Sequence, residues 1–549
     1  RSPVEEVLAR VWAELLGRPR IGTDEDFFEA GGDSVLAIQM VARARKEGIE
    51  VTPRQLFEHP TVAGLARVAG VASRGAPDEE VAPGEVPLTP VQLRFFEREV
   101  PDRHHWNQSL LLAPRERLDA AVLDRALARV AAHHDALRLR FARRGGAWIQ
   151  WYAEPGGQAA LERVDLRAVP AGERGAALEA AAAKLQAGLD LEQGPLLRAA
   201  LFDLGSEQRL LLAAHHLATD GVSWRILGED LQDAYRALLR GAEPALPAKT
   251  ASYRTWAQRL EEHAGSAALR DEAGYWTSRE LDAAAPLPQD LADGPNDVAS
   301  AAEVAVELGP DETRALLQDV PAVYRTRIDD VLLTALARTL SGWTGERLVA
   351  VELESHGRED LFPGVDVSRT VGWFTSVYPV LLDLRGVFGE GEELKAVKEQ
   401  LRAVPRQGIG YGVLRHLSAD AEVRRRLRAL PAPQVSFNYL GQLDAPLAGS
   451  LFALADGPVG PERAGSGERE HLLEVTASVQ DGVLRVRWEY GGRVHLPGTV
   501  RTLAVRYLAE LRALIAHCGA DDAGGSTPSD FPLADLDEAA LAALEEDFL

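Results

Sequence analysis

Two adjacent histidines, His215 and His216, end the apolar run LLLAA and are followed four residues later by Asp220. A neutral imidazole can act as a general base, and catalytic groups often stand where a strand ends at a cleft. Because adjacent strand residues point to opposite faces, only one of the two histidines can face a given cavity. That histidine could be a general base, a hydrogen-bonded core residue or a metal ligand. No third ligand stands at a recognisable spacing, so we expect no metal.

A second candidate is Ser34, which follows two glycines and Asp33 at the start of an apolar-periodic segment. A hydroxyl at a helix start is accessible, and the free N–H groups and positive end of the helix favour an attached phosphodiester. The alternative is that Asp33 or Ser34 only caps the helix.

Hydrophobic periodicity predicts the elements that position these residues. Amphipathic helices fill the first part of the chain, whereas strand-like runs such as 196–204 and 209–216 alternate with helical runs such as 118–138 further on. A stretch rich in proline, glycine and acidic residues separates the two parts, as a tether would. The predicted organisation is a small all-α domain (1–71), a linker (72–86), an α/β domain (87–520) with lobes at about 87–290 and 300–520, and an acidic tail (521–549) containing a short helix.

Bulk composition narrows the class of protein further. A length of 549 residues exceeds what one hydrophobic core normally supports. The net charge of −23 disfavours nucleic acid and anionic membranes as partners. The single cysteine, Cys518, excludes an internal disulfide and fits a reducing, cytoplasmic compartment. No apolar stretch reaches membrane-spanning length.

Residues 3–69 resemble the peptidyl carrier domain of nonribosomal peptide synthetases, whose signature around the modified serine is similar to DFFEAGGDS at 26–34. The resemblance implies that Ser34 carries 4′-phosphopantetheine, attached by a phosphopantetheinyl transferase. Asp33, where histidine is commoner, resembles the variant that precedes epimerization domains.

Residues 87 to about 520 resemble the condensation and epimerization superfamily of the same synthetases, whose HHxxxDG signature is present at 215–221. The resemblance implies a two-lobed, chloramphenicol-acetyltransferase-like α/β fold. It also implies that His216 faces the active-site tunnel as the catalytic histidine, while His215 and Asp220 are structural. We expect Asp220 to hold local geometry by a salt bridge or by hydrogen bonds to the backbone.

Four segments favour epimerization over condensation: GVSWRIL after Asp220, ELESHGRE at 352–359, TVGWFTSVYPV at 370–380 and PQVSFNYLGQLD at 433–444. The second aligns Glu354 with the family's catalytic glutamate. Ser355 replaces a glycine of the family pattern, and Arg94 stands where an aromatic residue is usual. These two departures bear on local packing rather than on the class of reaction.

Inversion at the α-carbon of a thioester requires one group to remove a proton and another to return a proton on the opposite face. His216 as a neutral base and Glu354 as an acid with a raised pKa would suit that task. The developing negative oxygen needs a donor, and the resemblance brings Asn438 and Tyr439 near the site. Ordinary strand packing is an equal alternative for Tyr439. We expect His356 and Arg358 to orient the Glu354 carboxylate.

The predicted activity is therefore interconversion of L and D configuration in an aminoacyl or peptidyl thioester tethered to the carrier domain. The alternatives are an amide-forming condensation domain and a noncatalytic module that recognises carriers. Expected partners are the tethered thioester and the upstream adenylation and downstream condensation domains of the synthetase.

Overall fold

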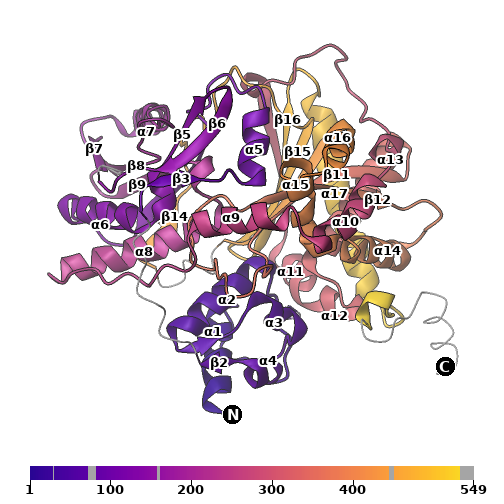
Figure 1. Cartoon of the computed structure of the whole chain (residues 1–549). Coiled ribbons are helices and arrows are strands. Elements are labelled where there is room, and N and C mark those ends of the chain that lie inside the picture. The colour runs from indigo at the N-terminus through magenta and orange to yellow at the C-terminus, as the bar shows by residue number, and fades with distance from the viewer. Residues whose placement is uncertain (29, 72–81, 157–160, 444–449, 532–549) are drawn as a thin grey trace.

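The computed structural model describes residues 1–28, 30–71, 82–156, 161–443 and 450–531. Figure 1 shows a small helical domain at the N-terminal end that lies beneath a much larger domain of two lobes, each built around a β-sheet. The linker predicted at 72–86 lies outside the described residues up to position 81, and so does the predicted tail helix from position 532 onward.

The N-terminal domain packs its helices around one apolar core that includes Trp12, Phe27 and Met40. The first helix begins at Pro3, and the preceding Ser2 forms a capping box with Glu5 in the first turn. Its elements are α1 (Pro3–Leu15), α2 (Ser34–Lys46), β1 (Ile49–Glu50), α3 (Pro53–Glu58), α4 (Val62–Val68) and β2 (Gly70–Val71). The predicted all-α domain is thus confirmed, apart from the short antiparallel pair of β1 and β2.

The first lobe is built around a five-stranded sheet in the order β14-β4-β9-β8-β7. Its strands are β4 (Asn107–Pro114), β7 (Leu161–Asp165), β8 (Leu197–Asp203), β9 (Gln208–His215) and β14 (Phe452–Leu454), accompanied by α6 (Ala120–His133), α7 (Arg174–Gln186) and α8 (Gly221–Leu239). The side chains of β9 are buried on both faces over most of its length, which explains its continuous apolar run.

A smaller sheet in the order β3-β6-β5 adjoins this lobe. It consists of β3 (Gly84–Val86), β5 (Leu139–Arg144) and β6 (Ala147–Tyr152), and α5 (Pro90–Glu97) follows β3. Because β3 pairs with β6, residues 84–86 belong to the large domain, and the predicted end of the linker at residue 86 is too late.

The second lobe is built around a six-stranded mixed sheet in the order β10-β16-β15-β13-β11-β12. Its strands are β10 (Ala301–Leu308), β11 (Leu348–Ser355), β12 (Ser376–Asp383), β13 (Val435–Gln442), β15 (Leu473–Gln480) and β16 (Val483–Gly491). Its long helices are α13 (Ile328–Thr344), α14 (Glu390–Arg402) and α17 (Pro497–Cys518), and α13 packs against both of the others.

The sequence predicts that one lobe follows the other along the chain, but the structure departs from this order at one strand. Strand β14 follows four strands of the second lobe along the chain, yet it pairs with β4 at the edge of the first lobe's sheet. The segment between the lobes holds α9 (Tyr253–His263) and α10 (Ala267–Thr277). Tyr253 on α9 donates its hydroxyl to the carbonyl of Trp373 at 2.8 Å, which fastens this segment to the second lobe.

Near the C-terminal end, Lys398 on α14 forms an ion pair with Asp530 at 2.7 Å. The first part of the predicted tail thus packs against the second lobe. Among the helices that the structure describes, none combines the length and apolar character needed to cross a membrane.

Candidate active site

The two histidines at the end of β9 have different surroundings. His215 is fully buried, its Nε2 contacts the carbonyl oxygen of Arg103 at 2.7 Å, and its Nδ1 accepts a hydrogen bond from the N–H of Leu217. Burial lowers the pKa of His215 to about 3. These contacts fix the end of the strand, in keeping with the structural role expected from sequence.

His216 begins a 3₁₀ turn, His216–Ala218, and lines a cavity of about 930 Å³ between the lobes. Its Nδ1 lies 2.8 Å from the carbonyl oxygen of Thr219, and its Nε2 lies 3.1 Å from the amide nitrogen of Gln108. The ring of Trp373 packs against the imidazole with centroids 4.3 Å apart. Burial lowers the pKa of His216 to about 4, so the ring is neutral near pH 7.

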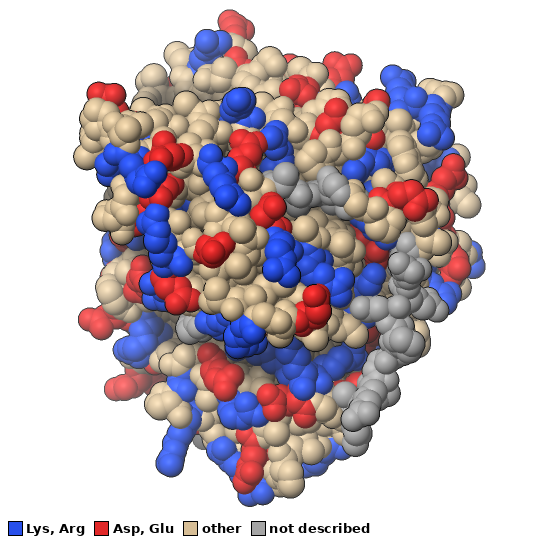
Figure 2. Space-filling model, turned by 90° about the vertical axis from the view of Figure 1, so that its left-hand side faces the viewer, with Lys and Arg blue, Asp and Glu red and all other residues tan. Residues whose placement is uncertain are grey.

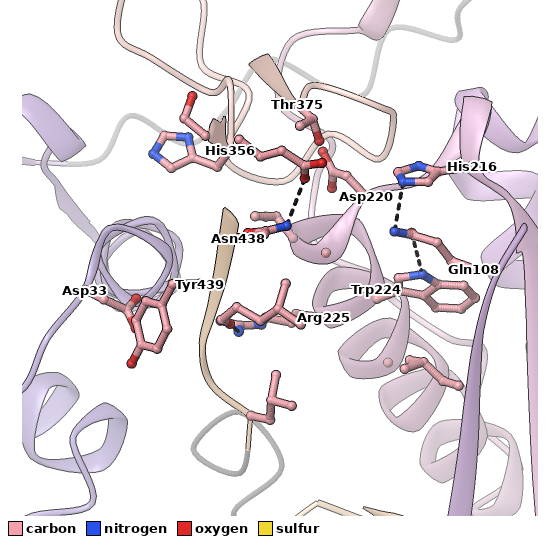
Figure 3. Close-up of a pocket in the computed structure, with 18 of the residues that line it drawn as sticks. Asp33, Gln108, His216, Asp220, Trp224, Arg225, His356, Thr375, Asn438 and Tyr439 are labelled. Atoms are coloured by element: carbon pink, nitrogen blue, oxygen red, sulfur yellow. Dashed lines mark hydrogen bonds between the residues drawn. The ribbon is translucent and has the colours of Figure 1, made fainter. Parts of the chain in front are cut away.

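Glu354 lies near the carboxyl end of β11 and lines the same cavity. Strands β11 and β13 run parallel with Leu353 opposite Phe437, so Glu354 and Asn438 are neighbours. Asn438 donates from Nδ2 to the Glu354 carboxylate at 2.8 Å (Figure 3). The exposed surface of Glu354 faces the cavity, and the protein around it excludes enough bulk water to raise the pKa of its carboxyl to about 7; the negative charge of Glu352 acts in the same direction.

Tyr439 follows Asn438 on β13 and points away from Glu354, as strand alternation requires. Figure 3 shows it beside Asp33 at the end of the cavity that lies against the N-terminal domain. Burial raises the pKa of the Tyr439 hydroxyl well above its usual value, and the charge of Asp33 adds to this. The structure therefore brings Asn438 to Glu354 but places Tyr439 nearer the carrier side.

Asp220 connects the lobes at the back of the site. It caps α8 by accepting from the N–H of Ser223 at 2.7 Å, and it also accepts from the N–H of Phe374. Arg358 donates to both Asp220 carboxylate oxygens, at 3.0 and 3.2 Å. These contacts match the structural role expected for Asp220.

The expectation that Arg358 orients Glu354 is wrong, because its terminal nitrogens donate to Asp220, to Ser223 and to two backbone carbonyls instead. His356 accepts at Nδ1 from the N–H of Arg358, and burial lowers its pKa to about 4. His356 thus supports the turn that holds Arg358, although its ring also lines the cavity.

The departures from the family pattern have local explanations. Arg94 forms ion pairs with Glu352 at 2.6 Å and with Glu470. Glu352 lies two positions before Glu354 on the same face of β11, and Arg94 offsets its negative charge. Ser355 donates its hydroxyl to the carbonyl of Gln407 at 3.2 Å. Both contacts support the site without entering its chemistry.

Ser34 begins α2, and the preceding Asp33 caps this helix by accepting from the N–H of Leu36 at 2.8 Å. The capping alternative therefore holds for Asp33. Asp33 also lines the cavity that holds His216 and Glu354. A helix N-terminus beside the mouth of a deep cavity suits a phosphodiester with a long arm attached to Ser34.

The N-terminal domain contacts the large domain at this mouth. Gln442 donates to the carbonyl of Gly31 at 2.9 Å, and the guanidinium of Arg327 lies 4.9 Å from the ring centre of Phe57. Lys46 forms an ion pair with Glu229 at the edge of the cavity, and Arg45 forms one with Asp366 in a neighbouring surface groove. Gly441 has a φ of +75°, a conformation that favours glycine, and the absence of a Cβ leaves room for the Asp33 carboxylate beside it.

Sequence reasoning missed several residues that line the cavity. Trp224 stands within the segment GVSWRIL, which does not link it to His216, and Gln108 belongs to no motif. Gln108 reaches His216 because β4 pairs with β9 in a register that sets it opposite Ala214. Only the pairing of these strands could have revealed it.

One group of side chains away from this cavity, His133, His134 and Asp230, has the residue types of a metal site. His133 Nε2 contacts the carbonyl of Pro247, and His134 Nε2 contacts Asp230 at 2.9 Å. Asp230 also forms an ion pair with Arg369. These contacts are typical of buried structural polar groups.

Comparisons with known proteins agree with this geometry. Residues 82–536 match the family described as Condensation domain, and residues 6–69 match the one described as Phosphopantetheine attachment site. The chain is similar to the crystal structure of the epimerization domain from the third module of tyrocidine synthetase B, with 35% identity and a TM-score of 0.76, covering 81% of this chain and 99% of that one.

Longer relatives align along nearly the whole chain. Linear gramicidin synthase subunits B and C of Brevibacillus parabrevis are each 47% identical to it over 98% of its length. The chain spans only 10% and 7% of those relatives.

Proposed function

Because this chain belongs to the condensation-domain family and carries a phosphopantetheine attachment domain, we propose that it inverts the α-carbon of an aminoacyl or peptidyl thioester held on Ser34. One observation carries the proposal: His216, Glu354 and the neighbour of Ser34, Asp33, line a single cavity. The similarity to an epimerization domain at 35% identity supports this reaction over others in the family.

The bound phosphopantetheine would supply the thioester linkage, which acidifies the α-hydrogen, and the length needed to enter the cavity. His216 would remove the α-proton at Nε2, since burial keeps its ring neutral above about pH 4. Glu354 would return a proton to the other face, since its carboxyl is protonated below about pH 7. The opposite direction would use the same two groups with their roles exchanged.

Asn438 would position the acid rather than act on substrate directly. Its Nδ2 holds one Glu354 oxygen, which leaves the other oxygen of that carboxyl to carry the transferable proton. The second N–H on Nδ2 could also face the thioester oxygen as negative charge develops there.

The test is to load Ser34 with an L-aminoacyl phosphopantetheine in deuterated buffer, hydrolyse the thioester and analyse its chirality and deuterium content. We expect both enantiomers, with deuterium at the α-carbon. Retention of the L configuration without deuterium would refute the proposal. The Ser34→Ala variant, which cannot be loaded, is the control for attachment.

The match to the Condensation domain family keeps amide formation as a second candidate. A free amine acceptor added to the loaded protein distinguishes the two reactions: amide product without α-deuteration would favour condensation. Under our proposal the chain works within a synthetase in the cytoplasm, after a phosphopantetheinyl transferase has modified Ser34. An upstream adenylation domain would supply its substrate and a downstream condensation domain would use its product.

A further inference from the structure

The imidazole of His216 is held at both nitrogens by groups whose hydrogen-bonding roles can be assigned from chemistry alone. The backbone carbonyl of Thr219, 2.8 Å from Nδ1, can only accept. Nδ1 must therefore carry a hydrogen. The state of Nε2 then depends on which end of the Gln108 amide faces it.

Trp224 determines that orientation. An indole N–H can only donate, and the Trp224 nitrogen lies 3.0 Å from Gln108 Oε1. A flipped amide would set its NH₂ group against the indole N–H, donor against donor. Gln108 must therefore present its NH₂ group to His216, where it lies 3.1 Å from Nε2. Figure 3 shows the row of Trp224, Gln108 and His216 joined by these two contacts.

The consequence is a ring that is protonated at Nδ1 and bears its lone pair at Nε2. An imidazolium would need an acceptor at Nε2, but it would meet the Gln108 donor instead. The arrangement thus opposes protonation of His216 independently of its burial, and the basic lone pair faces the amide of Gln108, which also lines the cavity.

The charged groups around His216 do not account for this state by themselves. Arg463 disfavours the imidazolium, while Asp220, at the start of α8, favours it. Asp220 is paired with Arg358, which offsets its charge. Glu354 on β11 lines the same cavity, and Trp373 faces the ring without charge.

We propose that Gln108 and Trp224 are positioning residues that hold His216 as the neutral Nδ1–H tautomer, so that Nε2 is available as the base of the reaction. This rests on the proposed function for its catalytic meaning, although the tautomer itself does not. The α-proton needs the same lone pair, so the Gln108 amide must move aside when a thioester enters. That displacement breaks one N–H···N hydrogen bond of ordinary length.

The decisive experiment is a pH titration of the full chain, without loaded substrate, followed by ¹⁵N NMR of histidine-labelled protein. The His216 signals are assigned by their loss in His216→Gln. In the wild type we expect the Nδ1–H tautomer from neutral pH down to about pH 5, because burial lowers the pKa of His216 to about 4. An Nε2–H tautomer would overturn the proposal.

Two variants separate the orienting role from simple packing. Trp224→Phe frees the Gln108 amide to rotate and offer its oxygen to Nε2–H, and Gln108→Glu places an acceptor there permanently. We expect the pKa of His216 to rise in both, by about 1 to 3 for the glutamate. Trp373→Phe is the matched control for loss of ring volume, since it makes the same substitution in the ring that packs against His216 and leaves the contact with Gln108 in place. Any rise in the pKa of His216 there should come from reduced burial alone and be smaller than in the other two variants.

An unchanged pKa in both Trp224→Phe and Gln108→Glu, or an equal rise in Trp373→Phe, would contradict the proposal. Because the titration needs no turnover, failure of the proposed epimerization would appear separately, as absence of α-deuteration in the loaded wild type. In the loaded protein, the acidic limb of the deuteration rate should move to higher pH with Gln108→Glu.

Discussion

At the scale of single residues, the site depends on two groups whose pKa values have moved in opposite directions from their ordinary values. Burial lowers the pKa of His216 to about 4 and raises that of Glu354 to about 7. Between these values the proposed base, His216, is neutral and the proposed acid, Glu354, is protonated. The rate of α-deuteration should therefore fall as pH drops through about 4 and fall again as pH rises through about 7.

The alkaline limb can be moved by changing the charge beside Glu354. Glu352→Gln removes a negative charge that raises the pKa of Glu354, so the alkaline limb should move to lower pH. Asn438→Asp places a carboxylate against Glu354 in place of a donor, so that limb should move to higher pH. A pH series of single-turnover deuteration measures both, and limbs that stay where they are in the two variants would mean that another group titrates.

At the scale of secondary-structure elements, the joint between the lobes depends on a buried ion pair. Asp220 caps α8 and binds Arg358, which follows β11, and both side chains are almost fully buried. Asp220→Ala would leave a buried guanidinium without its partner, which typically costs about 3 to 5 kcal/mol. We expect the free energy of unfolding, measured from the urea transition of the large domain, to fall by that amount, so that the midpoint moves to a lower urea concentration.

A matched double variant checks the cause. Replacing Arg358 by Met in the Asp220→Ala background removes the unpaired charge, so it should recover part of the lost stability. If the double variant were less stable than Asp220→Ala, the loss would come from the helix cap and not from the unpaired charge.

The elements also show how far the sequence predicts the site. His216 and Glu354 stand at strand ends within short motifs, and the apolar run at 209–216 located the strand that ends at His215. Gln108 could not be predicted, because its place beside His216 depends on the register of β4 against β9. The prediction that Arg358 contacts Glu354 was wrong for a similar reason. Its actual partner, Asp220, lies 138 positions away in the sequence and comes near only when the lobes pack together.

At the largest scale, hydrophobic periodicity predicts a small helical part and a mixed α/β part, and the resemblance carried by the motifs implies the two lobes. Neither predicts the crossing of β14 to the other lobe. That crossing depends on which sheet edge is open to a short strand, and this is a property of the assembled lobes.

Figure 2 shows positive and negative side chains interspersed over one face of the molecule, including the part formed by the N-terminal domain.

Charge complementarity between the two domains should affect the reaction rate. Arg45→Glu breaks the pair with Asp366 across the two domains, and the swapped double variant with Asp366→Arg restores opposite charges. Since half-exposed pairs contribute up to about 1 kcal/mol, we expect a loss of up to roughly fivefold in single-turnover rate, recovered by the swap and diminished in high salt. The same reversal in the exposed pair of Arg54 and Glu58, within the carrier domain, serves as the control.

Under the proposed function, His216 and Glu354 serve opposite faces of one α-carbon. The most direct measurement is α-deuteration of separately loaded L and D thioesters in His216→Gln and in Glu354→Gln, each followed by chiral analysis. Each variant should lose interconversion yet still deuterate one enantiomer with retention, and the enantiomer should be L in one variant and D in the other. Deuteration of the same enantiomer in both variants, or undiminished interconversion in either, would contradict the account.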